Sequence, residues 1–237
     1  MDTSHYRDLL ARFSTARVLV VGDIYLDENV YGVVTGVSLE APIPIYEVHE
    51  RRHNPGAAGN AACNAAALGA KTYVVGYVGN DMNAEVVRKE FAVRNVDTSG
   101  LVVHPTRATN TYGKLRAGGF NIPTQEILRT DTPTPVFVEG AVEDRIIANI
   151  RARAKDVDAI IVTDQVKSVA TRRVLDAVVE CAKQHKLITV GDSRGRAGEF
   201  HGFDTMVPND REAGIGTGID VVDEETLSDF SAGVNVD

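Results

Sequence analysis

The chain has 237 residues, 43% of them hydrophobic and 24% charged, and 33 Asp and Glu against 25 Lys and Arg give a net charge of −8. This length and composition predict one large globular domain or two small ones and exclude wholesale disorder. The acidic balance, without a Lys/Arg block, argues against a nucleic-acid-binding protein. Two cysteines, Cys63 and Cys181, are too few for a disulfide framework or a structural zinc site.

The sequence also argues against a membrane protein and against two classes of hydrolytic enzyme. No apolar run approaches the roughly 18 residues of a membrane span, and the first 17 residues lack the apolar core of a signal peptide. His49-Glu50-Arg51-Arg52-His53 has the H-E-x-x-H spacing of zinc enzymes, but that motif binds zinc on a helix and this segment lacks a helical period. No G-x-S-x-G nucleophile elbow occurs. We therefore expect a cytoplasmic protein that contacts neither nucleic acid nor membrane.

Short apolar runs that end in Gly, Asp or Thr alternate with alanine-rich or amphipathic stretches along the chain. The runs predict buried strands, and the other stretches predict helices. In chain order these elements are a strand over 17–23, a helix over 57–70, a strand over 72–78, a helix capped by Asp81 that reaches Phe91, a strand over 157–163, a helix over 169–185, and strands over 187–191 and 204–207. This alternation predicts an α/β fold with a mostly parallel sheet.

Two segments interrupt the alternation, at about residues 30–50 and 108–130. Both are rich in Val, Ile and Tyr, are punctuated by Gly and Pro, and lack a helical period. We interpret them as β-structure outside the main sheet that forms a small lid. The alternative is a pair of irregular surface hairpins without function.

Acidic and amide side chains recur at the predicted strand ends. In an open parallel sheet, ligands bind outside the carboxyl ends of the strands. Carboxylates and amides suit sugar hydroxyls, and a glycine-rich helix N-terminus favours anionic groups. Each position alone is also explained as a turn or a helix cap. The stretches concerned are 23–27, 54–60, 163–167, 191–195 and 208–212.

An ordered set of motifs carries a resemblance to a known family. The chain contains, in order, VVGDIYLDENVYG, SLEAPIPIYEV, NPGAAGNAACNAAALGA, VGYVGND, TNTYGKLR, ILRTD, TDQVKS, GDSRG and VPNDREA. Over roughly residues 17–213 it resembles the ribokinase-like (PfkB) carbohydrate kinases, and within them the heptose-7-phosphate kinases. The resemblance implies an α/β fold with a central, mostly parallel sheet flanked by helices and a small β lid.

The resemblance also implies a set of residues that bind the acceptor sugar. Asp27 would clasp acceptor hydroxyls, with Asp23 beside it, and Gly56, Ala57 and Asn60 would line the sugar pocket. As a separate hypothesis, we expect cationic residues of the lid region to neutralise a phosphate already on the sugar; the alternative is a solvated basic face. These cations are Lys114, Arg116 and Arg129.

The nucleotide site is implied by three later segments that match the family's motifs. Asp164 and Lys167 match a segment near the phosphoryl-transfer site, and Asp192 and Arg194 match a segment near the nucleotide. The family's N-x-x-E motif falls on Asn209, Asp210, Arg211 and Glu212, where Glu212 would reach Mg²⁺ through water.

The activity implied is transfer of the γ-phosphoryl group of ATP, with Mg²⁺, to the C1 hydroxyl of a heptose 7-phosphate in ADP-heptose and lipopolysaccharide-core synthesis. The lid would also form a homodimer contact. The family's catalytic aspartate lies in a late G-A-G-D segment that does not occur here, so we expect the base beyond Asp237, and residues 1–237 to form a kinase domain without its C-terminal part. We interpret 214–218 as a loop and 231–233 as a frayed end.

Several departures from the family pattern leave two alternatives open. Ala57 replaces the second glycine, Gln165 a tyrosine and Ser168 a glycine. One alternative is a catalytically silent sugar-phosphate-binding module, which has the pocket but not the base. The other is a kinase of the same fold that acts on ribose, fructose or a nucleoside.

Overall fold

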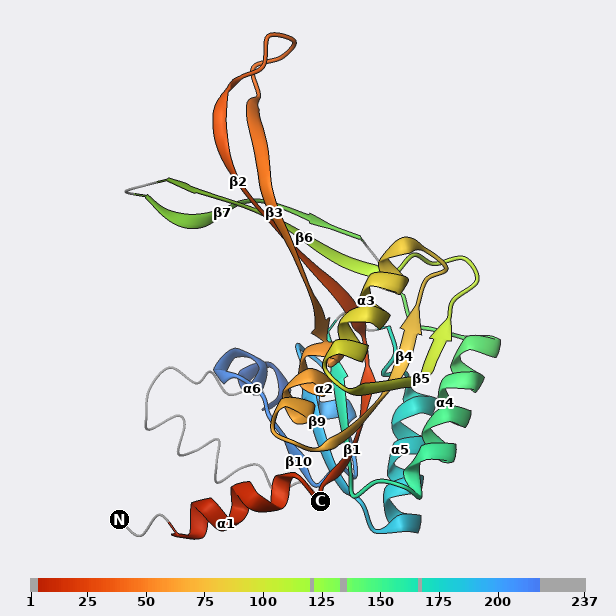
Figure 1. The fold of residues 1–237 in the computed structure, drawn as a ribbon. Coiled ribbons are helices and arrows are strands. Elements are labelled where there is room, and N and C mark those ends of the chain that lie inside the picture. Colours follow the sequence, from red (N-terminus) through yellow and green to blue (C-terminus); the bar gives the residue numbers. More distant parts are fainter. Residues whose placement is uncertain (1–3, 120–121, 133–135, 166–167, 218–237) are drawn as a thin grey trace.

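The computed structural model describes residues 4–119, 122–132, 136–165 and 168–217. Its main element is a sheet of six parallel strands in the order β10-β9-β8-β1-β4-β5, with helices on both faces (Figure 1). These strands are β1 (Arg17–Gly22), β4 (Lys71–Val78), β5 (Val96–Val103), β8 (Ala159–Asp164), β9 (Ile188–Ser193) and β10 (Thr205–Met206). The predicted α/β fold with a mostly parallel sheet is confirmed.

Alternate residues of each central strand pack on opposite faces of this sheet. In β1, Leu19 and Val21 face the α4 and α5 side, whereas Val20 faces the α2 and α3 side, and all three are fully buried. Because both faces are covered, the strand reads as a continuous apolar run. The helices are α2 (Ala58–Ala67), α3 (Met82–Val93), α4 (Gly140–Ala154) and α5 (Arg172–His185), with α1 (Ser4–Phe13), η1 (Ala197–Glu199) and α6 (Asp210–Thr217) at the periphery.

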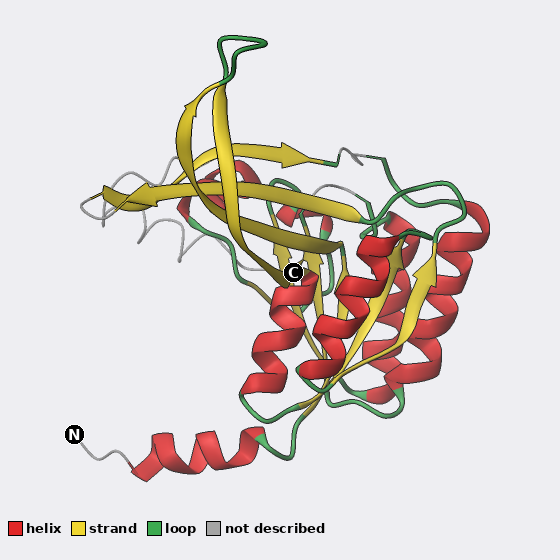
Figure 2. Ribbon diagram, turned by 45° about the horizontal axis from the view of Figure 1, so that its top comes forward, coloured by secondary structure: helices red, strands yellow, loops and turns green. Residues whose placement is uncertain are grey.

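A second sheet of four strands, in the order β3-β2-β6-β7, forms the predicted lid. Its strands are β2 (Ile24–Val37), β3 (Pro44–Ala57), β6 (Asn110–Gly119) and β7 (Ile122–Asp131). The β2–β3 hairpin rises from the main sheet, and β6 and β7 cross above the same edge (Figures 1 and 2). Only Asp23 separates β1 from β2, and β3 runs directly into α2, so the lid is joined to the main sheet by very short connections.

The structure corrects several sequence-based boundaries. Residues 24–27 and 54–56, expected as loops at strand ends, belong to the lid strands, because Tyr25 pairs with Gly56 and Asp27 with Asn54. Ala57, expected at the start of a helix, is the last residue of β3. Pro55 is tolerated there because β3 is an edge strand, where a missing N–H breaks no ladder. Residues 214–217 belong to α6 and not to a loop, whereas 231–233 lie outside the described residues.

Two core elements had no sequence prediction, namely β5 and α4. Both carry polar residues on their outer faces, so their apolar positions do not form a continuous run. In α4, for example, Ile146, Ile147 and Ile150 are buried while the intervening residues are mostly exposed or half-buried. In the part of the chain that the structure describes, no helix combines the length and apolar character needed to cross a membrane.

Candidate active site

The carboxyl ends of β1, β8 and β9 meet at the edge of the main sheet that lies beneath the lid (Figure 2). The parallel register places Gly22 beside Thr163, Thr163 beside Asp192, and Asp164 beside Ser193. Residues far apart in the sequence therefore share one edge, as expected for an open α/β sheet. In keeping with the expectations from the sequence, we call the part of this edge toward the lid the acceptor side and the part toward β9 and α6 the nucleotide side.

On the acceptor side, Asp27 lies on the lid strand β2, between the strands β3 and β6. Its Oδ1 is 3.2 Å from Lys114 Nζ on β6, and the two side chains are 26% and 20% exposed. A Cβ at Gly56 would lie only 3.0 Å from Asp27 Oδ2, so the glycine lets this carboxylate lie against the β3 backbone. Asp27, Gly56 and Lys114 thus form one compact group, with the carboxylate paired and still partly exposed.

Tyr112 is a member of this group that the sequence prediction missed. It stacks on the buried Tyr25 with ring centroids 4.2 Å apart, and the Arg129 guanidinium lies 4.0 Å from its ring centroid. Burial raises the pKa of Tyr25, so its hydroxyl stays protonated. Arg129 is in turn held by Asp131, with Nε–Oδ1 and Nη2–Oδ2 distances of 2.6 and 3.0 Å.

The period of a strand could have found Tyr112. In β6, Tyr112, Lys114 and Arg116 occupy alternate positions, and alternate residues of a strand share a face. Arg116 Nη2 lies 3.8 Å from Glu126 Oε2. The Nε of Arg116 is buried, and it has no hydrogen-bond partner among the described residues. The lid face next to Asp27 therefore combines an aromatic ring with three cations.

At the base of the lid, Ala57 adopts φ +52° and ψ −123°, a conformation that favours glycine. The resemblance to the family places a glycine at this position. Asn60, in the first turn of α2, is exposed and lines a groove of about 450 Å³ with Asn54 and Arg94. Ala57 thus stores backbone strain at the junction between β3 and α2.

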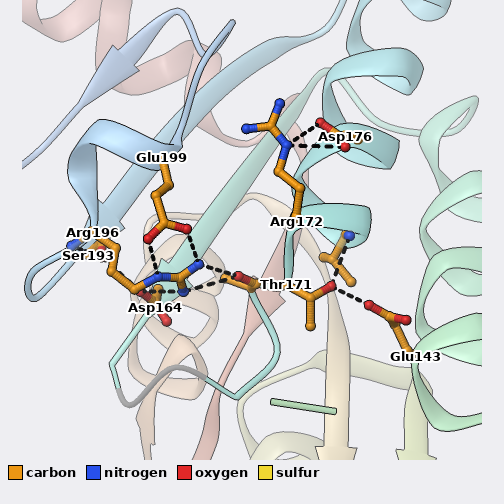
Figure 3. Close-up of polar contacts among 10 residues, drawn as sticks. Glu143, Asp164, Thr171, Arg172, Asp176, Ser193, Arg196 and Glu199 are labelled. Carbon is orange, nitrogen blue, oxygen red and sulfur yellow. Dashed lines mark hydrogen bonds and ion pairs between the residues drawn. The ribbon is translucent and has the colours of Figure 1, made fainter. Parts of the chain in front are cut away.

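On the nucleotide side, Asp164 is almost fully buried and is held by protein donors. Its Oδ2 accepts hydrogen bonds from Ser193 Oγ at 2.8 Å and from Arg196 Nη1 at 3.2 Å. Arg196, which the sequence prediction missed, also donates to Glu199 and to the Ala170 carbonyl (Figure 3). Only its position four residues after Asp192 could have suggested a link to this site.

Asp192 lies among like charges at the end of β9. Burial and the negative charges of Glu212 and Asp164 raise the pKa of its carboxyl, while Arg194 acts in the opposite direction. Carboxylates that repel one another favour a bound cation, and carboxylate oxygens are ligands that Mg²⁺ prefers. Within the described residues, no group of three His, Cys, Asp or Glu side chains could hold a metal ion by itself. A cation at this edge would therefore need ligands in addition to these described side chains.

The N-x-x-E motif forms the first turn of α6. Asn209 Oδ1 accepts from the Glu212 N–H at 2.9 Å, and Glu212 Oε2 accepts from the Asn209 N–H at 3.0 Å, which is a capping box. Asp210 and Arg211 are exposed beside it. The motif therefore has a local structural role at the helix terminus, whose partial positive charge suits phosphate.

Comparison with known proteins was made against family models, curated sequences and solved structures. The family model described as pfkB family carbohydrate kinase matches residues 15–232. The chain belongs to the pfkB family of carbohydrate kinases. The matched residues include the lid strands, the start of α2 and the strand ends described above.

Curated relatives and solved structures agree with this pfkB-family assignment. The chain is 32% identical over 235 residues, 99% of its length, to the bifunctional protein HldE of Citrifermentans bemidjiense, and 30% identical over 228 residues to that of Geobacter metallireducens. It spans about half the length of these relatives, 47% and 46%.

The fold is similar to two solved kinases. Escherichia coli phosphofructokinase-2, in its tetrameric inhibited form, gives a TM-score of 0.68 at 13% identity and covers 92% of this chain and 69% of its own. Arabidopsis thaliana ribokinase, complexed with ribose and ATP, gives a TM-score of 0.62 at 16% identity and covers 92% of this chain and 67% of its own.

The pfkB site residues expected from the sequence fall into three groups in the structure. Asp27, Gly56, Ala57, Lys114, Arg116 and Arg129 lie on or at the base of the lid, and Asp192, Arg194 and Glu212 interact on the nucleotide side. Asp23 and Asp164 reach the expected edge, but their carboxylates are buried against protein donors. Lys167 lies outside the described residues.

Proposed function

We propose that this chain is a heptose-7-phosphate kinase domain that transfers the γ-phosphoryl group of ATP to the C1 hydroxyl of the sugar phosphate. The observation that carries the proposal is the pairing of Asp27 with Lys114, next to Arg116 and Arg129 on the same lid sheet. A hydroxyl-binding carboxylate beside three cations matches an acceptor that has both hydroxyls and a phosphate. The bifunctional HldE relatives support a heptose substrate in ADP-heptose and lipopolysaccharide-core synthesis.

In this proposal, one group of acceptor residues contacts the sugar hydroxyls and another contacts the phosphate. Asp27 accepts hydrogen bonds from hydroxyls of the sugar ring, and Gly56 leaves room beside it. Lys114 contacts the phosphate through its compact ammonium group. Arg129 contacts it through its planar guanidinium, which can donate two parallel hydrogen bonds. Arg129 already has a fixed orientation, since Asp131 and the Tyr112 ring hold it, so less conformational entropy is lost on binding.

Nucleotide and Mg²⁺ would bind at the carboxyl ends of β8 and β9 and at the start of α6. Mg²⁺ would neutralise charge on the phosphates, and Glu212 and Asp192 would contact it directly or through water. Arg194, which is exposed, would contact a phosphate. We place this reaction in the cytoplasm, where ATP is available.

The lid also supports a homodimer. Its outer part exposes large apolar side chains, including Val34, Ile122 and Ile127 at 51%, 65% and 48% exposure. These three line an apolar groove of about 480 Å³ on the lid sheet. Apolar surface of this kind is typical of a contact between protein copies. Sedimentation would reveal a concentration-dependent dimer, which Ile127→Glu should weaken.

The decisive experiment is calorimetric titration with heptose 7-phosphate, free heptose and ribose 5-phosphate, followed by assay of ADP release with ATP and Mg²⁺. We expect heptose 7-phosphate to bind most tightly. Lys114→Met should weaken its binding by about 10- to 100-fold, corresponding to the roughly 1.5–3 kcal/mol of a charged hydrogen bond, and should affect free heptose much less. Arg52→Met, on β3 of the same lid sheet but paired with Glu50, is the matched control.

Three outcomes would change the proposal. Equal losses for phosphorylated and free sugar would contradict the role of Lys114 in phosphate binding. Tight binding of the sugar phosphate without any ADP release, even in a chain extended beyond Asp237 to include the expected base, would favour the silent binding module. Preference for ribose 5-phosphate would favour a kinase of the same fold with another acceptor.

A further inference from the structure

Asp23 occupies the single position between the main sheet and the lid. Its backbone N–H donates to Thr163 O at 3.3 Å, and its carbonyl accepts from the Ala58 N–H at 3.0 Å. The residue therefore contacts β8 on one side and the start of α2 on the other. Its side chain is fully buried, in contrast to Asp27 four residues later.

The Asp23 carboxylate is bound to the chain that follows β8. Oδ2 accepts from the Gln165 N–H at 2.9 Å, and Oδ1 accepts from Ser168 Oγ at 2.6 Å and from the Val169 N–H at 2.9 Å. Hydrogen bonds to a charged group typically contribute about 1.5–3 kcal/mol each, and a buried group left unsatisfied costs more. The lid junction and the chain after β8 are thus tied together and should move as one unit.

The same chain is held from the nucleotide side by Arg196. Its Nη1 and Nη2 both donate to the Ala170 carbonyl at 3.1 Å, and Nη1 also contacts Asp164 (Figure 3). The guanidinium lies 4.6 Å from the ring centroid of Phe137. Asp23 therefore binds Gln165, Ser168 and Val169 to the lid junction. Arg196 binds the next residue, Ala170, to the nucleotide side.

We propose that Asp23 is a positioning residue that couples acceptor binding to nucleotide binding through the chain after β8. The inference rests on the proposed function. A sugar phosphate bound at Asp27 and Lys114 fixes β2, which begins next to Asp23. The Asp23 carboxylate then holds Gln165 and Val169 in place. Gln165 adjoins Asp164, and Val169 adjoins Ala170, which Arg196 binds on the nucleotide side. Each ligand thereby stabilises the arrangement that the other binds, and the coupling must be reciprocal.

The chemistry of the contacts requires a carboxylate at this position. Among the described residues, three donors converge on the two oxygens, and a carboxylate is an acceptor at both. In Asp23→Asn, one oxygen becomes an NH₂ group, which must face the N–H of either Gln165 or Val169. Size is kept while one side of the contact becomes repulsive, so the substitution tests the hydrogen bonds rather than the packing.

The test is the affinity of a non-hydrolysable ATP analogue with Mg²⁺, measured by calorimetry with and without saturating heptose 7-phosphate. In the wild type we expect the sugar phosphate to tighten nucleotide binding about 10-fold, within the usual range of coupling. In Asp23→Asn, the ratio of the nucleotide affinities with and without sugar phosphate should fall to within about twofold of unity. Ser168→Ala removes the hydrogen bond from Ser168 Oγ to Asp23 and should lower this ratio to an intermediate value.

Asp204→Asn is the matched control. Asp204 accepts from the N–H and Oγ of Thr189 at the opposite end of β9, so its loss should lower stability without changing the coupling ratio. Denaturation midpoints of all variants show which are folded, and Ser168→Ala provides the test if Asp23→Asn does not fold.

The outcomes separate the inference from the proposed function. A wild type that binds neither ligand overturns both. A wild type that binds both ligands, but without coupling or with coupling that survives in Asp23→Asn and Ser168→Ala, overturns only the inference. An equal change of the ratio in Asp204→Asn would also overturn it, because the effect would then follow stability alone.

Discussion

The lid and the nucleotide side of the main sheet use the same residue types in opposite environments. Arg129 in the lid is 41% exposed and paired with a partner two residues away, whereas the Arg196 side chain is 7% exposed and bound to three elements. Asp27 and Asp23 repeat the contrast within one strand junction, at 26% and 0% exposure. Burial therefore separates charged residues that hold the fold from charged residues available to a ligand.

The contrast predicts its largest effect at Arg196. Arg196→Ala leaves the Asp164 carboxylate buried without its cation, so unfolding free energy should fall by about 3–5 kcal/mol. Arg129→Ala should cost at most about 1 kcal/mol, because its ion pair is exposed to solvent. Urea denaturation of both variants measures the difference. Similar losses for the two would refute the division between structural and ligand-facing charges.

A smaller effect is expected where the two regions join. Ala57→Gly removes the strain of a positive φ, roughly 1–3 kcal/mol, and adds backbone entropy to the unfolded chain, so a net gain of about 1 kcal/mol is expected. The same change at Ala65, inside α2, should instead destabilise by about 1 kcal/mol. Thermal unfolding of both variants checks the opposite signs. A loss of stability in Ala57→Gly would show that the junction is not strained.

The smallest effect on stability is expected at Asp192, on the nucleotide side. Because the folded-state pKa of Asp192 is raised, its carboxylate destabilises the fold above that pKa, and the penalty disappears below the unfolded value of about 3.9. Asp192→Asn should therefore stabilise the protein at neutral pH and change little at acidic pH. Denaturation midpoints across this range measure the trend.

Asp204→Asn should change the stability in the opposite direction. Hydrogen bonds from Thr189 lower the pKa of Asp204, so its stabilisation is present above the unfolded pKa and is lost as pH falls through the folded value. The variant should lose stability at neutral pH. If both variants changed stability in the same direction, the different surroundings of the two carboxylates would not explain their effects.

Much of the fold could be predicted because its signals are local. Continuous apolar runs marked β1, β4, β8 and β9, since both faces of these strands are covered, and Asp81 caps α3 as expected, with the Ala84 N–H 2.9 Å away. The lid boundaries could not be predicted as well. Residues 54–57 look like a turn because they contain Pro and Gly, yet they form the end of an edge strand, where a missing N–H is harmless.

The candidate site shows the same limit. Motif order located Asp27, Gly56, Lys114, Asp192 and Glu212 near one edge. The sequence did not indicate Tyr112 or Arg196, whose roles depend on contacts with residues distant in the chain. Nor did it distinguish Asp23 from Asp27, because both are aspartates next to the same apolar strand.

By itself, the sequence determined the α/β architecture, the presence of a lid and the residue types available at the strand ends, because periodicity and motif order are properties of the chain. Only the tertiary structure decided which of these charges are buried. That depends on which segments converge. Three donors from described residues after β8 bind the Asp23 carboxylate, whereas the Asp27–Lys114 pair between β2 and β6 stays partly exposed on the lid sheet. Burial requires each charge to find partners, and those partners come from elements far apart in sequence.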